Sequence, residues 1–276
     1  MVVDAVRAAL MEDLGLAGDV TSDAIIPETA KARAVMNARD KGVISGLALA
    51  QAAFEAMDPK LKFIALVSDG DRVKAGQDVA RIEGNARAIL AAERVALNYI
   101  CHLSGIATHT SLFAHEIAHT KAQICCTRKT IPGLRSFEKY AVKCGGGSNH
   151  RFGLDDAILI KDNHIAIAGG VKQAIDAARA FAGHLLAIEV EVDTIAQLRT
   201  ALKAGPDVVM LDNMTLEQLR KGVDIVGGKI PIEASGNVDI HTVKSIAETG
   251  VDYISTSKIT MSAPTLDLGL DISIRK

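Results

Sequence analysis

The chain has 276 residues, a formal net charge of -2, a hydrophobic fraction of 49% and a charged fraction of 23%, which is typical of a soluble globular protein. This balance provides no basic field for nucleic acid or an anionic membrane, and the lack of tryptophan argues against a base-stacking surface. The start of the chain lacks a signal-peptide pattern, and no apolar run approaches the roughly 20 residues that span a bilayer. The four cysteines form no C-x-x-C pair, so we expect reduced thiols in a cytoplasmic protein.

The first part of the chain predicts a mixed region of helices and strands. We expect a helix over 3–12, a strand over 32–40 and a buried, alanine-rich helix over 47–57. Alternating apolar residues and tight turns over 62–84 predict short strands. That stretch is similar to half of a biotinyl or lipoyl carrier domain. We interpret it as scaffold, and a carrier module stays open as an alternative.

A long helical stretch is predicted over 86–118, with an interruption near Ser104 and Gly105. Arg94 lies within this stretch, beside Glu93. An arginine on a helix is usually a surface residue or a salt-bridge partner, so the residue by itself indicates no function.

From about residue 120 the pattern changes to alternating strands and helices. The predicted strands are apolar runs at 123–127, 157–161, 186–192, 207–211, 230–234 and 252–256. The predicted helices between them span 171–181, 195–204, 216–223 and 240–249. Apolar strands that alternate with helices are typical of a parallel sheet covered by helices, so we expect an α/β fold here.

Polar residues follow each of these strands at its C-terminal end. They are Arg128 and Lys129, Lys161 and Asp162, Glu191 and Asp193, Asp212 and Asn213, residues 235–237, and residues 256–258. In an α/β barrel the C-terminal strand ends converge on one mouth, whereas a doubly wound sheet spreads them along an edge. Six strand ends with such residues favour the barrel.

The segment 126–164 concentrates basic residues around the glycine triplet 145–147. They are Arg128, Lys129, Arg135, Lys139, Lys143, His150, Arg151, Lys161 and His164. Several stand beside apolar runs that we interpret as buried strands. Because removing a positive charge from water is costly, this arrangement predicts a site that receives a polyanion. A solvated basic face is the alternative, and the neighbouring strands make it less favourable.

Two loops predict phosphate binding. Ser235-Gly236-Asn237 and Thr256-Ser257-Lys258 follow the last two predicted strands and consist mainly of small residues. Backbone N–H groups in such loops of an α/β barrel bind phosphate. A single Ser-Gly pair is a weak signal, but two such loops in succession are moderately specific.

Glu191 and Asp212 follow neighbouring strands and are suited to hold Mg²⁺ or the hydroxyls of a ribose. The alternative is that they neutralise Lys161 and Arg151 in a structural network. Glu189 competes with Glu191 for the functional role, because residues two apart share one face of a strand. Phosphate loops, carboxylates and several cations together fit a phosphorylated sugar and a second, acidic substrate.

Longer blocks carry a further signal. They are DVTS at 19–22, ERVALN at 93–98, LSGIAT at 103–108, TRKTIPGLR at 127–135, EKYAVKCGGGSNHRFGL at 138–154, LIKDNH at 159–164, EVEVD at 189–193, MLDN at 210–213, EASGNV at 233–238 and GVDYIS from 250. In this order, the blocks resemble the quinolinate phosphoribosyltransferase family, also called carboxylating nicotinate-nucleotide pyrophosphorylases.

The resemblance implies an α/β fold with an N-terminal open α/β sandwich and a C-terminal incomplete (β/α) barrel. We place the domains at 1–105 and 106–264, with a C-terminal segment, 265–276, that returns to the first. The implied reaction, in de novo NAD biosynthesis, joins quinolinate and phosphoribosyl pyrophosphate to give nicotinate mononucleotide, pyrophosphate and CO₂. A related group linked to molybdenum transport departs from the KDNH block, which favours quinolinate. A non-catalytic protein that binds a phosphorylated metabolite stays open.

The resemblance also implies residue roles. Lys129, Lys161, Glu191 and Asp212 are the expected catalytic residues. Substrate contacts are expected from Arg94, Thr127, Arg128, Lys129, His150, Arg151, Lys161, Glu191, Asp212 and the loops 235–237 and 256–258. Mg²⁺ is expected on the pyrophosphate, with Glu191 and Asp212 as candidate ligands.

In this family an arginine from the partner subunit completes the active site, and by motif that arginine is Arg94. We therefore expect a homodimer, and the sequence leaves open a larger ring such as a hexamer. Asn237 stands where many relatives have a second glycine, and its effect on the phosphate loop is also left open. We expect no nucleic acid and no membrane among the partners.

Overall fold

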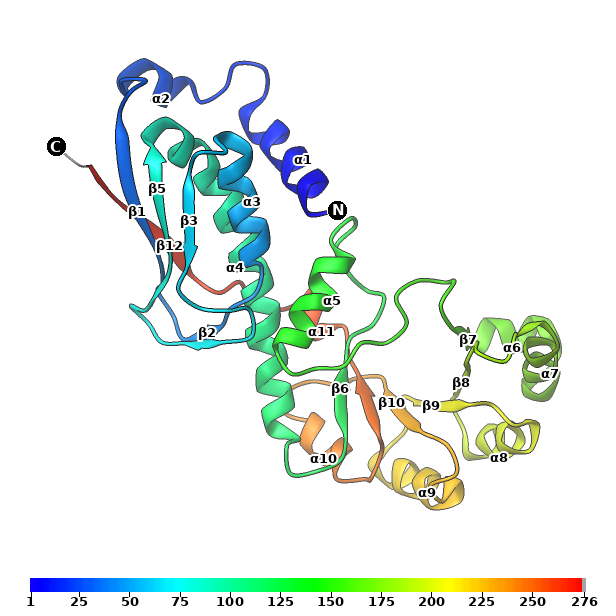
Figure 1. Ribbon diagram of the computed structural model, residues 1–276. Helices are drawn as coiled ribbons and strands as arrows, with labels where there is room; N and C mark the ends of the chain where they lie inside the picture. Colours follow the sequence, from blue (N-terminus) through cyan, green and yellow to red (C-terminus); the bar gives the residue numbers. More distant parts are fainter. Residues whose placement is uncertain (275–276) are drawn as a thin grey trace. The chain divides into compact units, whose positions relative to one another are not determined.

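The computed structural model describes residues 1–274, which form two compact units (Figure 1). The first unit comprises residues 1–109, 143–146 and the C-terminal part from 263, and the second comprises 110–142 and 147–262. Within the described residues, no helix has both the length and the apolarity needed to cross a membrane.

The first unit is built on an antiparallel sheet of four strands in the order β12-β1-β5-β3. These strands are β1 (Lys31–Ala38), β3 (Lys62–Ala65), β5 (Asp78–Asn85) and β12 (Leu268–Ile274), and a separate pair consists of β2 (Gly42–Val43) and β4 (Arg72–Val73). Its helices are α1 (Val2–Leu14), α2 (Val20–Ile25), α3 (Leu47–Met57) and the first part of α4 (Ala86–Glu116). Alternate residues of β1 are buried, as expected for a strand with one face on a core.

The ends of the first unit meet in its sheet. Strand β12 pairs antiparallel with β1 over seven residue pairs, from Ala38 with Leu268 to Ala32 with Ile274. Because β1 also pairs with β5, the last strand of the chain becomes an edge of the sheet formed by the N-terminal region.

Helix α4 continues through Ser104 and Gly105, so the predicted interruption is wrong. The Ser104 hydroxyl accepts the Ser45 backbone N–H at 2.9 Å and donates to the Ser45 carbonyl oxygen at 3.2 Å. A Cβ atom at position 105 would lie 2.2 Å from the carbonyl oxygen of Pro264. These two residues are therefore close-packing positions inside a helix, since glycine allows another backbone to approach.

The sequence pattern did not predict α2, which is too short to show a helical period. Its first turn is set by Asp19, whose carboxylate accepts the Ser22 backbone N–H at 3.0 Å and the Ser22 hydroxyl at 2.5 Å. These hydrogen bonds also lower the pKa of Asp19. An aspartate at this position satisfies N–H groups that the helix itself leaves without partners.

The second unit contains a parallel sheet of six strands in the order β6-β11-β10-β9-β8-β7. The strands are β6 (Gln123–Cys125), β7 (Ile158–Ile160), β8 (Ile188–Val192), β9 (Val208–Asp212), β10 (Ile232–Ser235) and β11 (Tyr253–Ser255). The helices are α5 (Arg135–Cys144), α6 (Asp162–Ala168), α7 (Val171–Phe181), α8 (Ile195–Ala204), α9 (Leu216–Val226), α10 (Val243–Ala247) and α11 (Lys258–Met261).

The strand order identifies an incomplete barrel. Strands β6 and β7 are consecutive along the chain in this unit, and a closed barrel would pair them. In this sheet they lie at opposite edges instead. The predicted fold class, with a mixed N-terminal part and an incomplete C-terminal barrel, is therefore confirmed. All six predicted strands are present, most of them one or two residues shorter than predicted.

Local signals explain why the helices between these strands form where they do. Helices α8 and α9 begin with reciprocal caps, in which Thr194 pairs with Gln197 and Thr215 pairs with Gln218. Both helices end at a glycine in the left-handed conformation. Helices α5, α6 and α11 were not predicted, because their basic and polar residues were assigned to the binding site alone.

Candidate active site

A cavity of about 830 Å³ opens at the C-terminal ends of the parallel strands in the second unit. Its lining includes Thr127, Arg128, Lys129, His150, Arg151, Lys161, Glu191, Asp212, Ser235, Gly236, Asn237, Thr256, Ser257 and Lys258. Thus every predicted site residue except Arg94 contributes to one cavity. Its volume lies within the range of small-molecule sites.

Two arginines line the cavity close to one another. Arg128 follows β6, and Arg151 lies in the loop between α5 and β7. The Nε atoms of both arginines are buried without a hydrogen-bond partner in the described part of the chain. Burial and the neighbouring charge of Arg128 lower the pKa of Arg151. Because two desolvated cations of like charge lie together here, an anion in the cavity would satisfy both.

Lys129 and Lys161 add two further cations, each with a constrained backbone. The Lys129 N–H donates to the Thr127 hydroxyl at 3.0 Å, and its carbonyl oxygen accepts from the Thr260 hydroxyl at 2.8 Å. The Lys161 N–H donates to Nδ1 of His164 at 2.9 Å. The side chains extend from fixed backbone positions at the C-terminal ends of β6 and β7.

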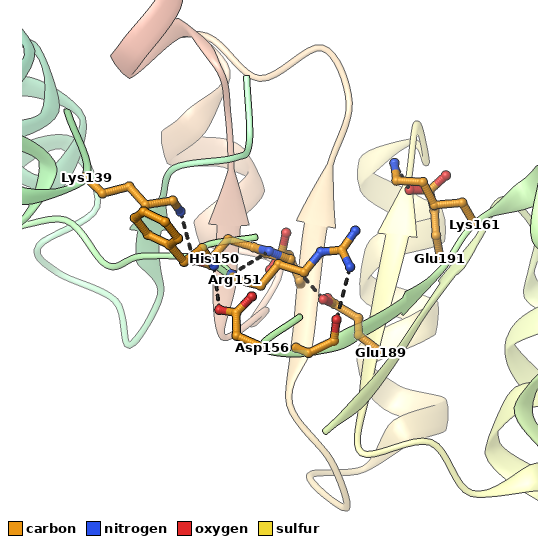
Figure 2. Close-up of polar contacts among 10 residues, drawn as sticks. Lys139, His150, Arg151, Asp156, Lys161, Glu189 and Glu191 are labelled. Atoms are coloured by element: carbon orange, nitrogen blue, oxygen red, sulfur yellow. Dashed lines mark hydrogen bonds and ion pairs between the residues drawn. The ribbon is translucent and has the colours of Figure 1, made fainter. Parts of the chain in front are cut away.

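The two glutamates of β8 have different environments (Figure 2). Glu191 lines the cavity and forms an ion pair with Lys161, whose Nζ lies 2.9 Å from the Glu191 carboxylate. Glu189 is buried and accepts from His150 Nε2 at 2.9 Å. Of the two glutamates, Glu191 is therefore the one that lines the cavity. Its ion pair with Lys161 agrees with the alternative in which this carboxylate neutralises Lys161 in a structural network.

The loop 235–237 contains two residues with a positive φ, a conformation that favours glycine and asparagine. Gly236 has a φ of +91°, and a Cβ atom there would lie 2.2 Å from Asn213 Oδ1. Asn237 has a φ of 52°, in the left-handed region that asparagine tolerates better than most residues. Its side chain donates to Asn213 Oδ1 at 3.3 Å. Asn237 thus adopts a conformation that glycine would also adopt.

The loop 256–258 is fixed by its threonine. The Thr256 hydroxyl donates to the Val238 carbonyl oxygen at 3.3 Å and accepts the Lys258 N–H at 3.2 Å. The Thr256 N–H donates to the Cys125 carbonyl oxygen at 3.1 Å. Lys258 Nζ lies 3.6 Å from an oxygen of Asp239, which also lines the cavity.

Not all basic residues of the segment 126–164 face the cavity. Lys139 is buried, and its Nζ donates to Cys126 Sγ at 3.0 Å and to the His150 carbonyl oxygen at 2.8 Å. Arg135 donates to the carbonyl oxygens of Phe152 at 3.1 Å and Arg128 at 3.4 Å. The predicted cluster is therefore divided, because these two cations hold the backbone of the loops that carry the cavity residues.

Glu233 was not singled out from the sequence, although it is a charged residue in an otherwise apolar strand. It lies on β10, lines the cavity and is 4% exposed. Burial and the neighbouring charge of Glu189 raise the pKa of Glu233 to about 7. A charged residue inside an apolar strand was the signal that could have identified it.

Arg94 lies exposed on α4 in the first unit. Its expected role depends on a second subunit, so the assignment stays a prediction.

Loops with small residues at the last two strand ends, carboxylates on the middle strands and paired arginines define an α/β-barrel enzyme that binds phosphorylated and carboxylated ligands. Comparison with known protein families makes this class more specific. Residues 19–104 match the family described as quinolinate phosphoribosyl transferase, N-terminal domain, and residues 106–271 match its C-terminal domain. The chain therefore belongs to the quinolinate phosphoribosyl transferase family.

Individual relatives agree with this membership. The chain is 42% identical over 264 residues to a probable carboxylating nicotinate-nucleotide pyrophosphorylase of Bacillus subtilis, covering 96% of this chain and 91% of the relative. It is 41% identical to the carboxylating nicotinate-nucleotide pyrophosphorylase of Mycobacterium leprae, covering 98% and 96%. A crystal structure of nicotinate-nucleotide pyrophosphorylase from Ehrlichia chaffeensis superposes with a TM-score of 0.94 at 41% identity, covering 98% of each chain.

Proposed function

We propose that the chain transfers the phosphoribosyl group of phosphoribosyl pyrophosphate to quinolinate and releases pyrophosphate and CO₂, giving nicotinate mononucleotide for NAD biosynthesis. Family membership supports the reaction class. The observation that carries the proposal is that one cavity combines two kinds of anion-binding group, the side chains of Arg128 and Arg151 and the loops 235–237 and 256–258. We call these two sets the acceptor end and the donor end, and they adjoin where β6 pairs with β11. A pyridine dicarboxylate and a phosphorylated sugar require these two kinds of contact.

The acceptor end suits quinolinate because the substrate carries two carboxylates on a flat ring. Arg128 and Arg151 supply guanidinium donors, and carboxylates bind such donors through strong charge-assisted hydrogen bonds. Lys129 and Lys161 add positive charge, and His150 belongs to the same end of the cavity. Thr127 holds the backbone of Lys129 through its hydroxyl.

The donor end suits a phosphoribosyl group. Cleavage of the bond to pyrophosphate leaves positive charge on the ribose ring, which Glu191 and Asp212 stabilise electrostatically from neighbouring strands. The loops 235–237 and 256–258 bind phosphate through backbone N–H groups. The cavity thereby holds the ring nitrogen of quinolinate close to the sugar carbon that it attacks.

The chemistry requires no nucleophile from the protein. The pyridine nitrogen forms the new bond to the sugar carbon as the bond from that carbon to pyrophosphate breaks. Loss of CO₂ then leaves an electron pair on the ring carbon next to the nitrogen, which now carries positive charge, and that carbon takes up a proton. The cation-rich cavity agrees with a reaction in which charge stabilisation dominates.

Mg²⁺ is proposed as the metal that accompanies pyrophosphate. The oxygen donors of Glu191 and Asp212 are of the type that Mg²⁺ prefers, and both line the cavity. When bound, Mg²⁺ supplies positive charge that stabilises the leaving pyrophosphate. Glu191 is already paired with Lys161 in the structure, so Lys161 keeps that carboxylate in place from the other side.

The proposed assembly is a homodimer in which Arg94 of the partner subunit completes the acceptor end. Its support is the position of Arg94 within the family block 93–98. An Arg94→Ala variant and an Arg128→Ala variant should each be inactive, and mixing them under conditions of subunit exchange should restore activity. Verified exchange without restored activity would contradict a shared site. A cytoplasmic location is also proposed, since none of the four cysteines forms a disulfide in the described part of the chain.

The decisive test is turnover of purified protein with quinolinate, phosphoribosyl pyrophosphate and Mg²⁺. We expect CO₂ and nicotinate mononucleotide to form in equal amounts. Binding of both substrates without either product would identify a non-catalytic binding protein. Turnover of nicotinate in place of quinolinate would agree with phosphoribosyl pyrophosphate as the donor and would contradict quinolinate as the acceptor.

A further inference from the structure

A buried carboxylate lies next to the acceptor end and has no part in the chemistry described above. Glu189 on β8 is 8% exposed and, among the described residues, is not part of the cavity lining. Its Oε2 accepts from His150 Nε2 at 2.9 Å, while its Oε1 is buried without a hydrogen-bond partner. Because burying a charged carboxylate is costly, its retention requires an explanation.

Both ring nitrogens of His150 are occupied. Nδ1 accepts the Arg151 backbone N–H at 2.9 Å, so the ring proton must lie on Nε2, which donates to Glu189. Burial opposes charge on the ring, but the Glu189 hydrogen bond and the charges of Glu233 and Glu189 together raise the pKa of His150. A second proton on Nδ1 would nevertheless break the bond to Arg151. The geometry therefore makes Nδ1 the acceptor for Arg151 and Nε2 the donor to Glu189.

His150 and Arg151 are fixed from several sides (Figure 2). Lys139 Nζ donates to the His150 carbonyl oxygen at 2.8 Å. The Arg151 guanidinium donates through Nη1 to the Ala157 carbonyl oxygen at 3.0 Å. The backbone of Arg151 is thus held by the imidazole and its side chain by the loop before β7. The Nε–H of Arg151 remains as a buried donor without a partner in the described part of the chain.

We propose that Glu189 is a positioning residue, which holds the His150 ring with its Nε2 proton towards Glu189, so that Nδ1 fixes the backbone of Arg151 at the acceptor end. In this arrangement His150 supports Arg151 through its ring nitrogen Nδ1. The inference deepens the proposed function and rests on it for the identity of the acceptor. Glu233, whose Oε2 lies 3.7 Å from His150 Nε2, is too distant to replace Glu189 without a rearrangement.

This proposal and simple electrostatics predict opposite effects of removing Glu189. Loss of a negative charge beside a site for a dianion should strengthen quinolinate binding if charge alone decides. Loss of a positioning contact should weaken it, because His150 can then turn and Arg151 loses its fixed backbone. The sign of the change therefore separates the two explanations.

The experiment compares Glu189→Leu with Glu189→Gln in the full-length protein by calorimetric titration. For Glu189→Leu we expect quinolinate binding to weaken by about tenfold, the order expected for a lost charge-assisted hydrogen bond. The amide oxygen of Glu189→Gln still accepts from Nε2, so we expect its quinolinate affinity to stay within about threefold of the wild type. In both variants the affinity for phosphoribosyl pyrophosphate should change by less than about twofold.

Glu233→Gln is the matched control, because it alters a second buried glutamate that makes no hydrogen bond to His150 Nε2. Its effect on quinolinate affinity should be smaller than that of Glu189→Leu, and thermal unfolding of each variant reports whether the fold is retained. Unchanged or tighter quinolinate binding by Glu189→Leu overturns the proposal. An equal loss in Glu189→Gln also overturns it, because that variant keeps an acceptor for His150 Nε2 and should keep its affinity.

Crystal structures of the wild type and of Glu189→Leu without substrate separate this inference from the proposed function. We expect the His150 ring to turn and Arg151 to shift in the variant. Unchanged positions of both residues would overturn the inference, whatever the acceptor. Failure of the wild-type protein to bind or convert quinolinate would instead contradict the proposed function.

Discussion

The acceptor end and the donor end of the cavity offer different groups to an anion. At the acceptor end, Arg128 and Arg151 supply charge from side chains whose Nε atoms are buried. At the donor end, the loops 235–237 and 256–258 supply small residues and backbone groups in defined conformations, including Gly236 at a φ of +91°. Side-chain binding depends on charge, whereas backbone binding depends on conformation. Substitutions at the two ends should therefore affect different substrates and different properties of the protein.

The largest effect is expected from Arg151→Ala. The substitution removes one of the two arginines of the acceptor end, so kcat/KM for quinolinate should fall by about 10²- to 10³-fold. The affinity for phosphoribosyl pyrophosphate should change by less than about threefold. Steady-state kinetics and separate binding measurements provide both values.

The matched control for Arg151→Ala is Arg179→Ala. Arg179 forms an ion pair with the Asp207 carboxylate at 3.1 Å, and neither residue lines the cavity. Loss of Arg179 should therefore leave both substrate affinities unchanged. If Arg151→Ala weakened phosphoribosyl pyrophosphate as strongly as quinolinate, the division of the cavity into two ends would be wrong.

Glu191→Gln tests whether this carboxylate acts in the chemical step or only in the ion pair with Lys161. If Glu191 has its proposed role of stabilising charge that develops on the ribose, the substitution should lower kcat by about 10²-fold with little change in either KM. Single-turnover measurements report the chemical step directly. Retained kcat together with a lowered melting temperature would show that the pair with Lys161 is structural.

A smaller effect is expected from Gly236→Ala at the donor end. A Cβ atom would meet Asn213 Oδ1 at 2.2 Å and the Asn213 nitrogen at 2.8 Å, so the loop must move. We expect about tenfold weaker binding of phosphoribosyl pyrophosphate and a loss of about 1 to 3 kcal/mol in the free energy of unfolding. Quinolinate affinity should be retained.

Asn237→Gly is the control for this loop. Asn237 already has a φ of 52°, which glycine adopts without strain, so phosphoribosyl pyrophosphate affinity should stay near that of the wild type. A large loss in Asn237→Gly would show that the side chain contributes more than backbone conformation. Calorimetric titration of both variants measures the difference.

The last effect concerns stability and not substrate binding. Burial and the charge of Glu189 raise the pKa of Glu233 to about 7, above its usual value of 4.5, while His150 opposes the shift. The folded state therefore favours the protonated carboxyl group. The stability that this proton provides is fully present below about pH 4.5 and is lost as the pH rises through about 7.

Glu233→Gln removes that dependence. Relative to the wild type, the variant should gain stability between about pH 4.5 and 8, by up to about 3 kcal/mol in the free energy of unfolding. Urea unfolding at several pH values measures the difference, and a difference that does not vary with pH would contradict the raised pKa. This result would show how strongly the buried carboxylates under the acceptor end interact.

Much of the architecture could be predicted because local patterns decide it. Alternation of apolar strands with amphipathic helices indicated the parallel sheet, and polar residues after each strand indicated one shared site, since parallel strands end at the same edge. Two local features misled the prediction. Ser104 and Gly105 suggested a helix break, although their roles come from contacts with Ser45 and Pro264, which are distant in sequence.

The sequence by itself determined which residues gather at the strand ends, because strand periodicity and chain order are local properties. It did not determine which of them face the cavity. Glu189 and Glu191 share one strand face, yet Glu189 is buried against His150 while Glu191 lines the cavity and pairs with Lys161. Lys139 likewise became a buried support for the His150 loop. Tertiary structure decided these roles because a buried charge takes the partner that the fold brings to it.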